Sequence, residues 1–228
     1  MRLKTQINHQ FIIRGDYDSL PDNIIGVAVS LLNDDINHSG IFIRYNNTNY
    51  LFHFDSVDVV LIEIPKDAIV FFKQLTFIPP EFITSTFHWF RQLEKFKSPD
   101  YGLFYSGSFY NESTLEFIDK NQMPEIMSCV GFCLNVLKTV LRGNDFINYT
   151  DWNYHNGITD DKILRYFINA KKNYPDIDII EFAQHVRRIL PVEYFTAGFD
   201  LNIPVKKAFT DSNNKEVTKI IMEKVSSF

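Results

Sequence analysis

Two cysteines and two strand histidines are the residues of this sequence best suited to nucleophilic chemistry. Its only cysteines are Cys129 and Cys133, and Cys129 stands where an apolar helical pattern begins. A helix N-terminus favours a thiolate, because its free N–H groups and its dipole stabilise negative charge on sulfur. A histidine that takes up the thiol proton would complete the nucleophile. His38 and His53, both in strand-like segments upstream, are the candidates for that task.

The two histidines belong to a predicted β-hairpin. Residues 38–45 (HSGIFIRY) and 50–55 (YLFHFD) read as strands, and the Asn-rich segment 46–49 between them reads as a tight turn. An odd register would place His38 and His53 on one face, where His53 could fix the ring orientation and tautomer of His38. Asp55 has the same parity as His53 and is a competing partner. The alternative for His53 is a half-buried histidine with a structural role only.

Two further expectations concern the start of the predicted cysteine helix. Gly131 would let another chain segment approach closely, and the N–H of Cys129 could bind a developing oxyanion. Cys133 lies one turn further on and is expected to pack inward as a small apolar residue. The alternative for Cys129 is the same: a buried, inert thiol.

Composition limits the classes of protein to consider. The chain has 228 residues, 45% of them hydrophobic, which suits one domain or a domain with an appended lobe. A net charge of -5 argues against nucleic acid as a partner. Neither a membrane span nor a signal peptide is predicted, because the apolar runs are too short and none follows the first basic residues. A cytoplasmic location is expected, with delivery outside the cell as an effector left open.

The order of the predicted elements indicates an α+β fold, in which an antiparallel sheet packs against the cysteine helix and further helices follow. Strands are predicted at 24–32, 38–45, 50–55 and 57–64, helices at 66–75, 80–95, 127–141, 159–170, 176–190 and 212–228, and a strand pair at 194–209.

Three short motifs resemble those of the NlpC/P60 superfamily of papain-like cysteine hydrolases. They are CVGF at 129–132, HSGI at 38–41 and YLFH at 50–53. The histidine motif precedes the cysteine motif, an order that resembles the circularly permuted branch with its YiiX-like amidases and lecithin:retinol acyltransferase-like enzymes. The Asn-Cys-Glu-His and Cys-Ser-Glu motifs of those two groups are absent. The resemblance covers about 24–141.

By this resemblance, residues 1–145 form a permuted NlpC/P60-like catalytic core, and 146–228 form a mainly helical extension packed on the same domain. It implies that Cys129 is the nucleophile, that His38 is the general base and acid, and that His53 orients His38. Tyr101 and Tyr105 are candidates for oxyanion or substrate contacts. The implied substrate is a peptide, a peptidoglycan fragment or an N-acyl compound. No cofactor and no metal ion is implied.

Three functions compete at this point. The first is hydrolysis of an amide, and the second is acyl transfer or thioester hydrolysis by the same residues. An acyl pocket for the second could come from Phe71, Phe72 and the segment 87–96. The third is a binding module without catalysis, with contact aromatics Trp89, Tyr101, Phe104, Tyr105, Phe109 and Tyr110. A zinc site of His38, His53 and Cys129 is set aside, since no closely spaced ligand pair supports it.

Overall fold

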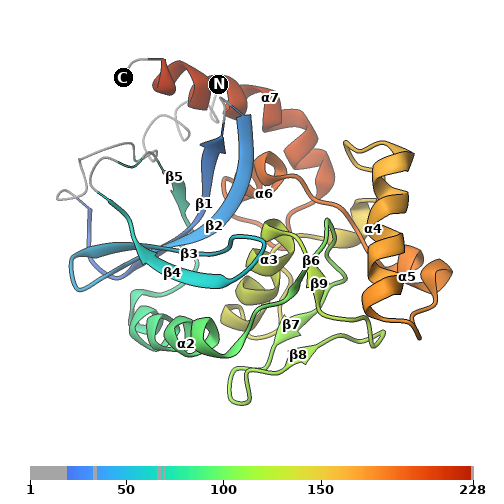
Figure 1. Cartoon of the computed structure of the whole chain (residues 1–228). Coiled ribbons are helices and arrows are strands. Elements are labelled where there is room, and N and C mark those ends of the chain that lie inside the picture. Colours follow the sequence, from blue (N-terminus) through green and yellow to red (C-terminus); the bar gives the residue numbers. More distant parts are fainter. Residues whose placement is uncertain (1–19, 33–34, 66–67, 69, 227–228) are drawn as a thin grey trace.

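The computed structural model describes residues 20–32, 35–65, 68 and 70–226. Residues 1–19, for which no signal peptide is predicted, and the last two residues of the predicted terminal helix lie outside the described part. Figure 1 shows a curved sheet on one side of the molecule, helix α3 beside it, and helices α4 and α5 on the far side of α3. The fold is α+β, as the order of elements predicts.

The sheet has five antiparallel strands in the order β4-β3-β2-β1-β5. The central strands are apolar over most of their length because both of their faces are covered by side-chain clusters. The strands are β1 (Ile24–Leu32), β2 (Asp35–Tyr45), β3 (Thr48–Phe54), β4 (Val59–Glu63) and β5 (Phe71–Gln74).

The β2–β3 hairpin has the predicted turn and the predicted register. Asn46 and Asn47 both adopt positive φ, 50° and 60°, as a two-residue hairpin turn requires. Ile41 pairs with Phe52, so strand alternation places His38 and His53 on the same face of the sheet.

Helix α2 covers one part of the sheet and helices α3 and α6 cover another (Figure 1). Helix α3 follows two short strand pairs, β6 with β9 and β7 with β8. The bounds of these elements are η2 (Pro80–Phe82), α2 (Ile83–Phe96), β6 (Asp100–Tyr101), β7 (Phe109–Tyr110), β8 (Phe117–Ile118), β9 (Ile126–Met127) and α3 (Cys129–Val140).

The C-terminal part of the chain supplies both core and surface helices. Helix α6 is buried from Glu193 to Ala197 and packs on β1, β2 and α7. Helices α4 and α5 enclose a separate apolar cluster with Phe104. The elements here are η3 (Tyr149–Asp151), α4 (Asp160–Asn173), α5 (Ile179–His185), α6 (Pro191–Ala197) and α7 (Lys207–Val225).

Two of the predicted elements are wrong, and a third is too long. Within the predicted helix 66–75, of which 66, 67 and 69 lie outside the described residues, the chain forms β5, and Phe71 and Phe72 fill opposite faces of the sheet. The predicted helix 176–190 ends at His185, after which the chain extends and pairs with Tyr105. In place of a strand pair at 194–209 there are α6 and the start of α7, because Pro191 begins a helix instead of ending one.

Candidate active site

Helix α3 begins at Cys129, as the sequence predicts. Ser128 is its N-cap, with a side chain that accepts a hydrogen bond from the Gly131 N–H at 3.0 Å. Gly131 permits the predicted close approach: a Cβ there would lie 2.4 Å from the carbonyl oxygen of Phe104. The loop that carries Phe104 is therefore pressed against the first turn of the cysteine helix.

The two histidines contact each other directly. His38 Nε2 and His53 Nδ1 are 2.7 Å apart, and the rings are nearly perpendicular at 83°. Gly40 makes room for this arrangement, because a Cβ there would meet Leu51 and the Cβ of His53. Asp55, the competing partner, is exposed and accepts the N–H groups of Val57 and Asp58, each at 2.8 Å.

The sulfur of Cys129 meets the hairpin at Ser39, the residue after His38. The N–H and the hydroxyl of Ser39 lie beside the sulfur and favour its thiolate, as do the N–H groups of Val130 and of Cys129 itself. Burial acts more strongly in the opposite direction, so the pKa of the Cys129 thiol is raised above its ordinary value. The lowering that a helix N-terminus alone would give is thus more than offset.

Both histidines are neutral at neutral pH. Burial lowers the pKa of His38, against a smaller opposing effect of the Asp55 charge. Burial and repulsion from His38 lower the pKa of His53 to about 4, again opposed by Asp55. Together with the raised pKa of the thiol, these shifts leave Cys129, His38 and His53 uncharged in the resting protein.

A hydrogen bond between two neutral imidazoles needs one donor and one acceptor nitrogen. When His38 Nε2 donates to His53 Nδ1, the lone pair of His38 Nδ1 is left to accept a proton from another group. His53 Nε2 then carries a hydrogen, and this atom is buried without a hydrogen-bond partner in the described part of the chain. The pair can therefore act as an oriented base.

The two tyrosines have different positions relative to the sulfur. Tyr101 pairs with Met127, two residues before the cysteine, and the Cys129 sulfur is among the groups that raise its pKa, after burial and Tyr166, to about 12. Tyr105 is buried, with its hydroxyl directed to the Ser108 carbonyl at 3.5 Å and its ring against Tyr149. The structure brings Tyr101 to the cysteine and places the Tyr105 hydroxyl in a different buried group.

Sequence reasoning missed two residues beside the site. Ser39 lies inside the HSGI motif, but its contact with the sulfur depends on how α3 docks on β2. Tyr194 of α6 donates its hydroxyl hydrogen to the Gly40 carbonyl at 3.1 Å and also contacts Cys133, which is fully buried as expected. The sequence did not identify Tyr194 as a site residue, because it lies in the segment 194–209, which was predicted to form a strand pair.

The aromatic residues named for the two competing functions are mostly core. Trp89, Phe104, Tyr105 and Tyr110 are all at least nine-tenths buried, so they form no exposed contact cluster. The phenylalanines suggested for an acyl pocket also belong to the core, apart from the exposed Phe96; the buried ones are Phe71, Phe72, Phe87 and Phe90.

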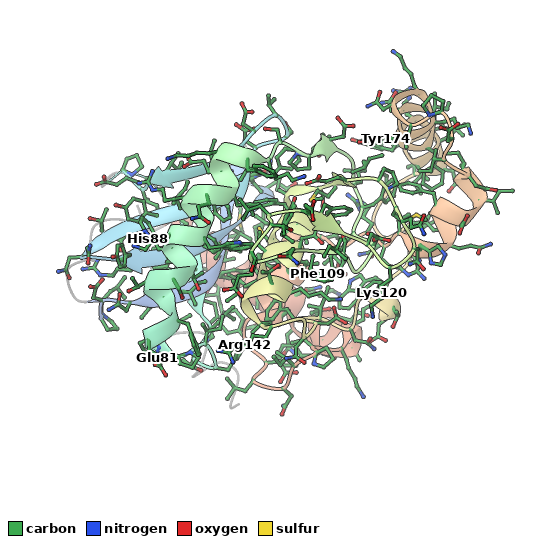
Figure 2. The ribbon with its side chains drawn as sticks, turned by 90° about the horizontal axis from the view of Figure 1, so that it is seen from below. Glu81, His88, Phe109, Lys120, Arg142 and Tyr174 are labelled. Carbon is green, nitrogen blue, oxygen red and sulfur yellow. The ribbon has the colours of Figure 1, made fainter. Side chains whose placement is uncertain are left out.

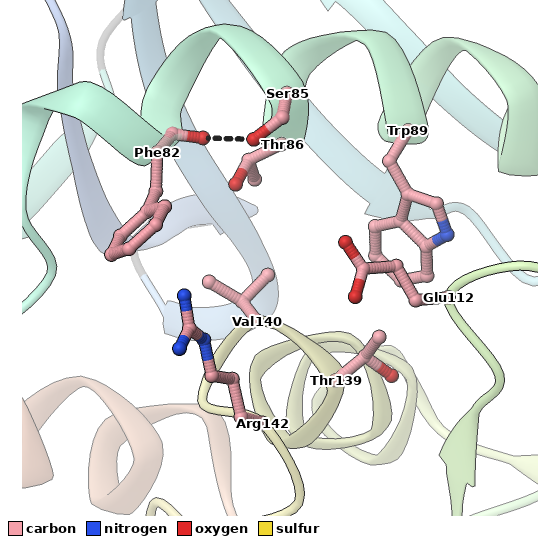
Figure 3. A pocket seen from close by; sticks show the side chains of 8 residues that line it. All are labelled: Phe82, Ser85, Thr86, Trp89, Glu112, Thr139, Val140 and Arg142. Carbon is pink, nitrogen blue, oxygen red and sulfur yellow. Dashed lines mark hydrogen bonds between the residues drawn. The ribbon is translucent and has the colours of Figure 1, made fainter.

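A pocket of about 340 Å³ lies between α2 and the C-terminal end of α3, where Figure 3 shows Arg142 and Glu112 facing it. Val140 lines it, which places it about 16 Å along the helix axis from Cys129. His88 is exposed on α2 (Figure 2), and its ring contacts Tyr45, at the end of β2 away from His38. Neither feature belongs to the site at Cys129.

Among the described residues, no group of three or more histidines, cysteines and carboxylates is arranged to hold a metal ion. Within the same residues, no helix combines the length and the apolar character needed to cross a bilayer. Comparisons with protein-family models, with curated proteins and with solved structures found no match.

Proposed function

We propose that the protein is a thiol-dependent hydrolase of an amide bond, with Cys129 as nucleophile, His38 as general base and acid, and His53 as the residue that orients His38. The observation that carries the proposal is the 2.7 Å contact between His38 Nε2 and His53 Nδ1 on a strand whose next residue, Ser39, touches the Cys129 sulfur. Ser39 and His38 are successive residues of a strand, so their side chains start on opposite faces of the sheet. The proposal therefore requires His38 to reach the thiol around the end of β2, because nucleophilic catalysis needs a neutral, oriented imidazole beside the sulfur.

In the acylation half of the reaction, the neutral resting state makes His38 a general base. His38 Nδ1 takes the thiol proton as the sulfur forms a bond to the amide carbon, and the carbonyl electron pair moves to oxygen. The N–H groups at the start of α3 stabilise that oxyanion. The carbon–nitrogen bond then breaks, and His38 gives its proton to the leaving amine.

In the second half, water replaces the amine. His38 takes a proton from water as the oxygen bonds to the acyl carbon, the carbon–sulfur bond breaks, and the proton returns to sulfur. Hydrolysis is preferred to transfer of a lipid-like acyl group because the phenylalanines that would have formed an acyl pocket are core residues. A peptide, a peptidoglycan fragment or an N-acyl compound remains the proposed substrate.

The acylation step can be tested with p-nitrophenyl acetate, an activated acyl donor that needs no specific recognition. We expect one acetyl group per chain, mapped to Cys129 by peptide mass spectrometry, with Cys133 unmodified because it is fully buried. His38→Ala should slow acylation at least about 100-fold, the usual contribution of a general base.

His88→Ala is the matched control, because His88 is an exposed histidine on a different element. It should leave the acylation rate unchanged. Equal labelling of both cysteines, or a rate at Cys129 that His38→Ala does not alter, would remove the proposed mechanism. Peptidyl aminomethylcoumarin amides would then report whether the acylated cysteine also turns over an amide.

A further inference from the structure

A second pocket, of about 480 Å³, is lined in part by α4, the helix that lies on the side of α3 away from the sheet (Figure 1). Loop residue Leu103, the start of α4 and the segment before α6 form its walls. Two cations line it, Lys162 and Arg188, together with Tyr166 and Thr159.

Tyrosine side chains connect this pocket to the cysteine. Tyr166 hydrogen-bonds to Tyr101, with ring centroids 6.3 Å apart, and Tyr101 in turn lies beside Cys129. Tyr101 pairs with Met127, and the Gly102 N–H donates to the Met127 carbonyl at 2.9 Å. The pocket wall and the start of the cysteine helix are thus parts of one connected structure.

The backbone around Arg188 is fixed. Arg187 and Tyr105 exchange two backbone hydrogen bonds of 2.8 Å, and the Arg188 N–H donates to the Asn153 carbonyl at 3.0 Å. The guanidinium is held at Nη1 by the Asn156 carbonyl. Arg188 is therefore presented to the pocket in a defined position.

No ion pair formed by the described residues includes Arg188 or Lys162. Glu193 lies near Arg188, but its Oε2 accepts from Leu190 and Asn156. The Glu193 charge therefore offsets part of the Arg188 charge without an ion pair, and Lys162 adds a second cation to the pocket.

Two further carboxylates belong to the same helix. Asp160 and Asp161 are exposed in the first turn of α4, outside the pocket lining, and Asp160 contacts His155 at 3.1 Å. Neither occupies the place where Arg188 faces the pocket.

The geometry points to this pocket as the binding site for a carboxylate of the substrate, so that the enzyme prefers acidic amides. The inference rests on the proposed function, because it assumes that the scissile amide lies at Cys129. Arg188 offers a planar fork of donors that matches a carboxylate, and Lys162 adds a mobile charge. Leu103 and Ile158 would contact the aliphatic part of the acidic residue.

The test uses chloroacetyl peptides, which alkylate a cysteine and need no turnover. Chloroacetyl-peptide amides of one, two and three residues, ending in Glu or in the neutral isostere Gln, are compared by the rate of Cys129 labelling. We expect one length at which the Glu peptide labels about tenfold faster, the size of one charge-assisted hydrogen bond. The advantage should shrink as salt is added.

Variants assign the preference to the pocket. Arg188→Gln and Lys162→Gln should each reduce the advantage of the Glu peptide while the Gln peptide labels at its former rate. Arg187→Gln is the matched control, because the Arg187 guanidinium donates to the carbonyls of Gln184 and Val186 instead of lining the pocket. Lys162 is exposed, so its variant keeps the test valid should Arg188→Gln disturb folding.

A second arm separates the two sources of a carboxylate. Peptides that end in Gln are compared as free acids and as amides, which tells a terminal carboxylate from a side-chain carboxylate. Equal labelling by all acidic and neutral peptides in the wild-type protein would overturn the inference. Its failure is distinct from failure of the proposed function, in which p-nitrophenyl acetate would not acylate Cys129 or His38→Ala would not slow the reaction.

Discussion

The buried polar groups near the two ends of helix α3 differ in how fully they are hydrogen-bonded. Towards its C-terminal end, Lys138 donates to the Gly107 carbonyl at 2.8 Å, Thr139 to the Tyr110 carbonyl at 2.6 Å, and Asn135 accepts from Ser108 at 2.7 Å. At its start, the buried Ser39 hydroxyl has only the Cys129 sulfur beside it, and on the neighbouring strand β3 His53 Nε2 is buried without a hydrogen-bond partner among the described residues.

The difference distinguishes buried polar groups that stabilise the fold from buried polar groups whose hydrogen bonding is incomplete. Satisfied polar groups hold the loop 105–110 against the helix and add to the stability of the fold. Unsatisfied polar groups cost stability and persist where another role requires them. The cysteine end is therefore the end of α3 at which a substrate could complete the hydrogen bonding.

Replacing Cys129 should show the largest effect, on activity alone. Cys129→Ala should lower turnover of an amide substrate at least about 1,000-fold, as loss of a nucleophile does in other hydrolases. The free energy of unfolding should change by less than about 1 kcal/mol, since the residue is only partly buried. Turnover and thermal unfolding of the same preparation check both parts.

The matched variant is Cys133→Ala, one turn further along the helix. It removes a fully buried sulfur and should cost about 1 to 2 kcal/mol of stability, while each folded molecule stays active. A Cys133→Ala protein that is folded and inactive would reverse the assignment of the two thiols.

Acid should weaken the cysteine end through His53. Its pKa is 6.5 when unfolded and about 4 in the fold, so the unfolded chain binds the proton more readily. The stability that the neutral histidine provides is complete above pH 6.5 and is lost as the pH falls from there to about 4. The loss amounts to roughly 3 kcal/mol.

Urea unfolding at a series of pH values measures this loss in the wild type and in His53→Gln. The two stability curves should run parallel above pH 6.5 and converge or cross below it. Curves that stay parallel down to pH 4 would show that His53 titrates normally in the folded protein.

At the C-terminal end of α3, the stabilising role of Lys138 can be removed without touching the site. Lys138→Met loses the bond to the Gly107 carbonyl and leaves Asp145, 2.8 Å from Nζ, without its cation. We expect a destabilisation of about 2 kcal/mol, measured by urea unfolding. The pH dependence of Cys129 alkylation by iodoacetamide should not change.

Lys219→Met serves as the comparison, because the Lys219–Glu223 pair is exposed on α7 and contributes little. Equal destabilisation by the two substitutions would mean that burial of Lys138 has no energetic consequence.

The smallest effect is expected from Ser39→Ala. The hydroxyl favours the thiolate, so its loss should raise the pKa of the Cys129 thiol further and slow alkylation about threefold at neutral pH. Unfolding should be little affected, since the hydroxyl contacts only the sulfur, which is uncharged in the resting protein. Faster alkylation would mean that Ser39 shields the sulfur instead of stabilising its charge.

Local signals were enough to predict the hairpin and the start of the cysteine helix. Asn46 and Asn47 specify a turn, and strand alternation then places His38 and His53 on one face. Ser128 before an apolar helical pattern specifies where the helix begins.

The remaining features depend on contacts between distant segments. Phe71 and Phe72 form a strand because β1 offers them an edge, and nothing in the local sequence distinguishes that from a helix. The net effect of burial on the Cys129 thiol and the position of Arg188 beside Tyr101 both depend on how whole elements pack. Spacing along the chain carries no information on either.

The hydrogen bond from Tyr194 to Gly40 joins residues 154 positions apart, and it lies next to the histidine strand. A ribosome that adds about 5 to 20 residues per second needs roughly 8 to 30 s to make the chain between them. During that interval the hairpin can form and α3 is synthesised, but α6, which carries Tyr194, is not yet complete. The contact that fixes the Gly40 carbonyl, beside the histidine strand, is therefore added late in synthesis.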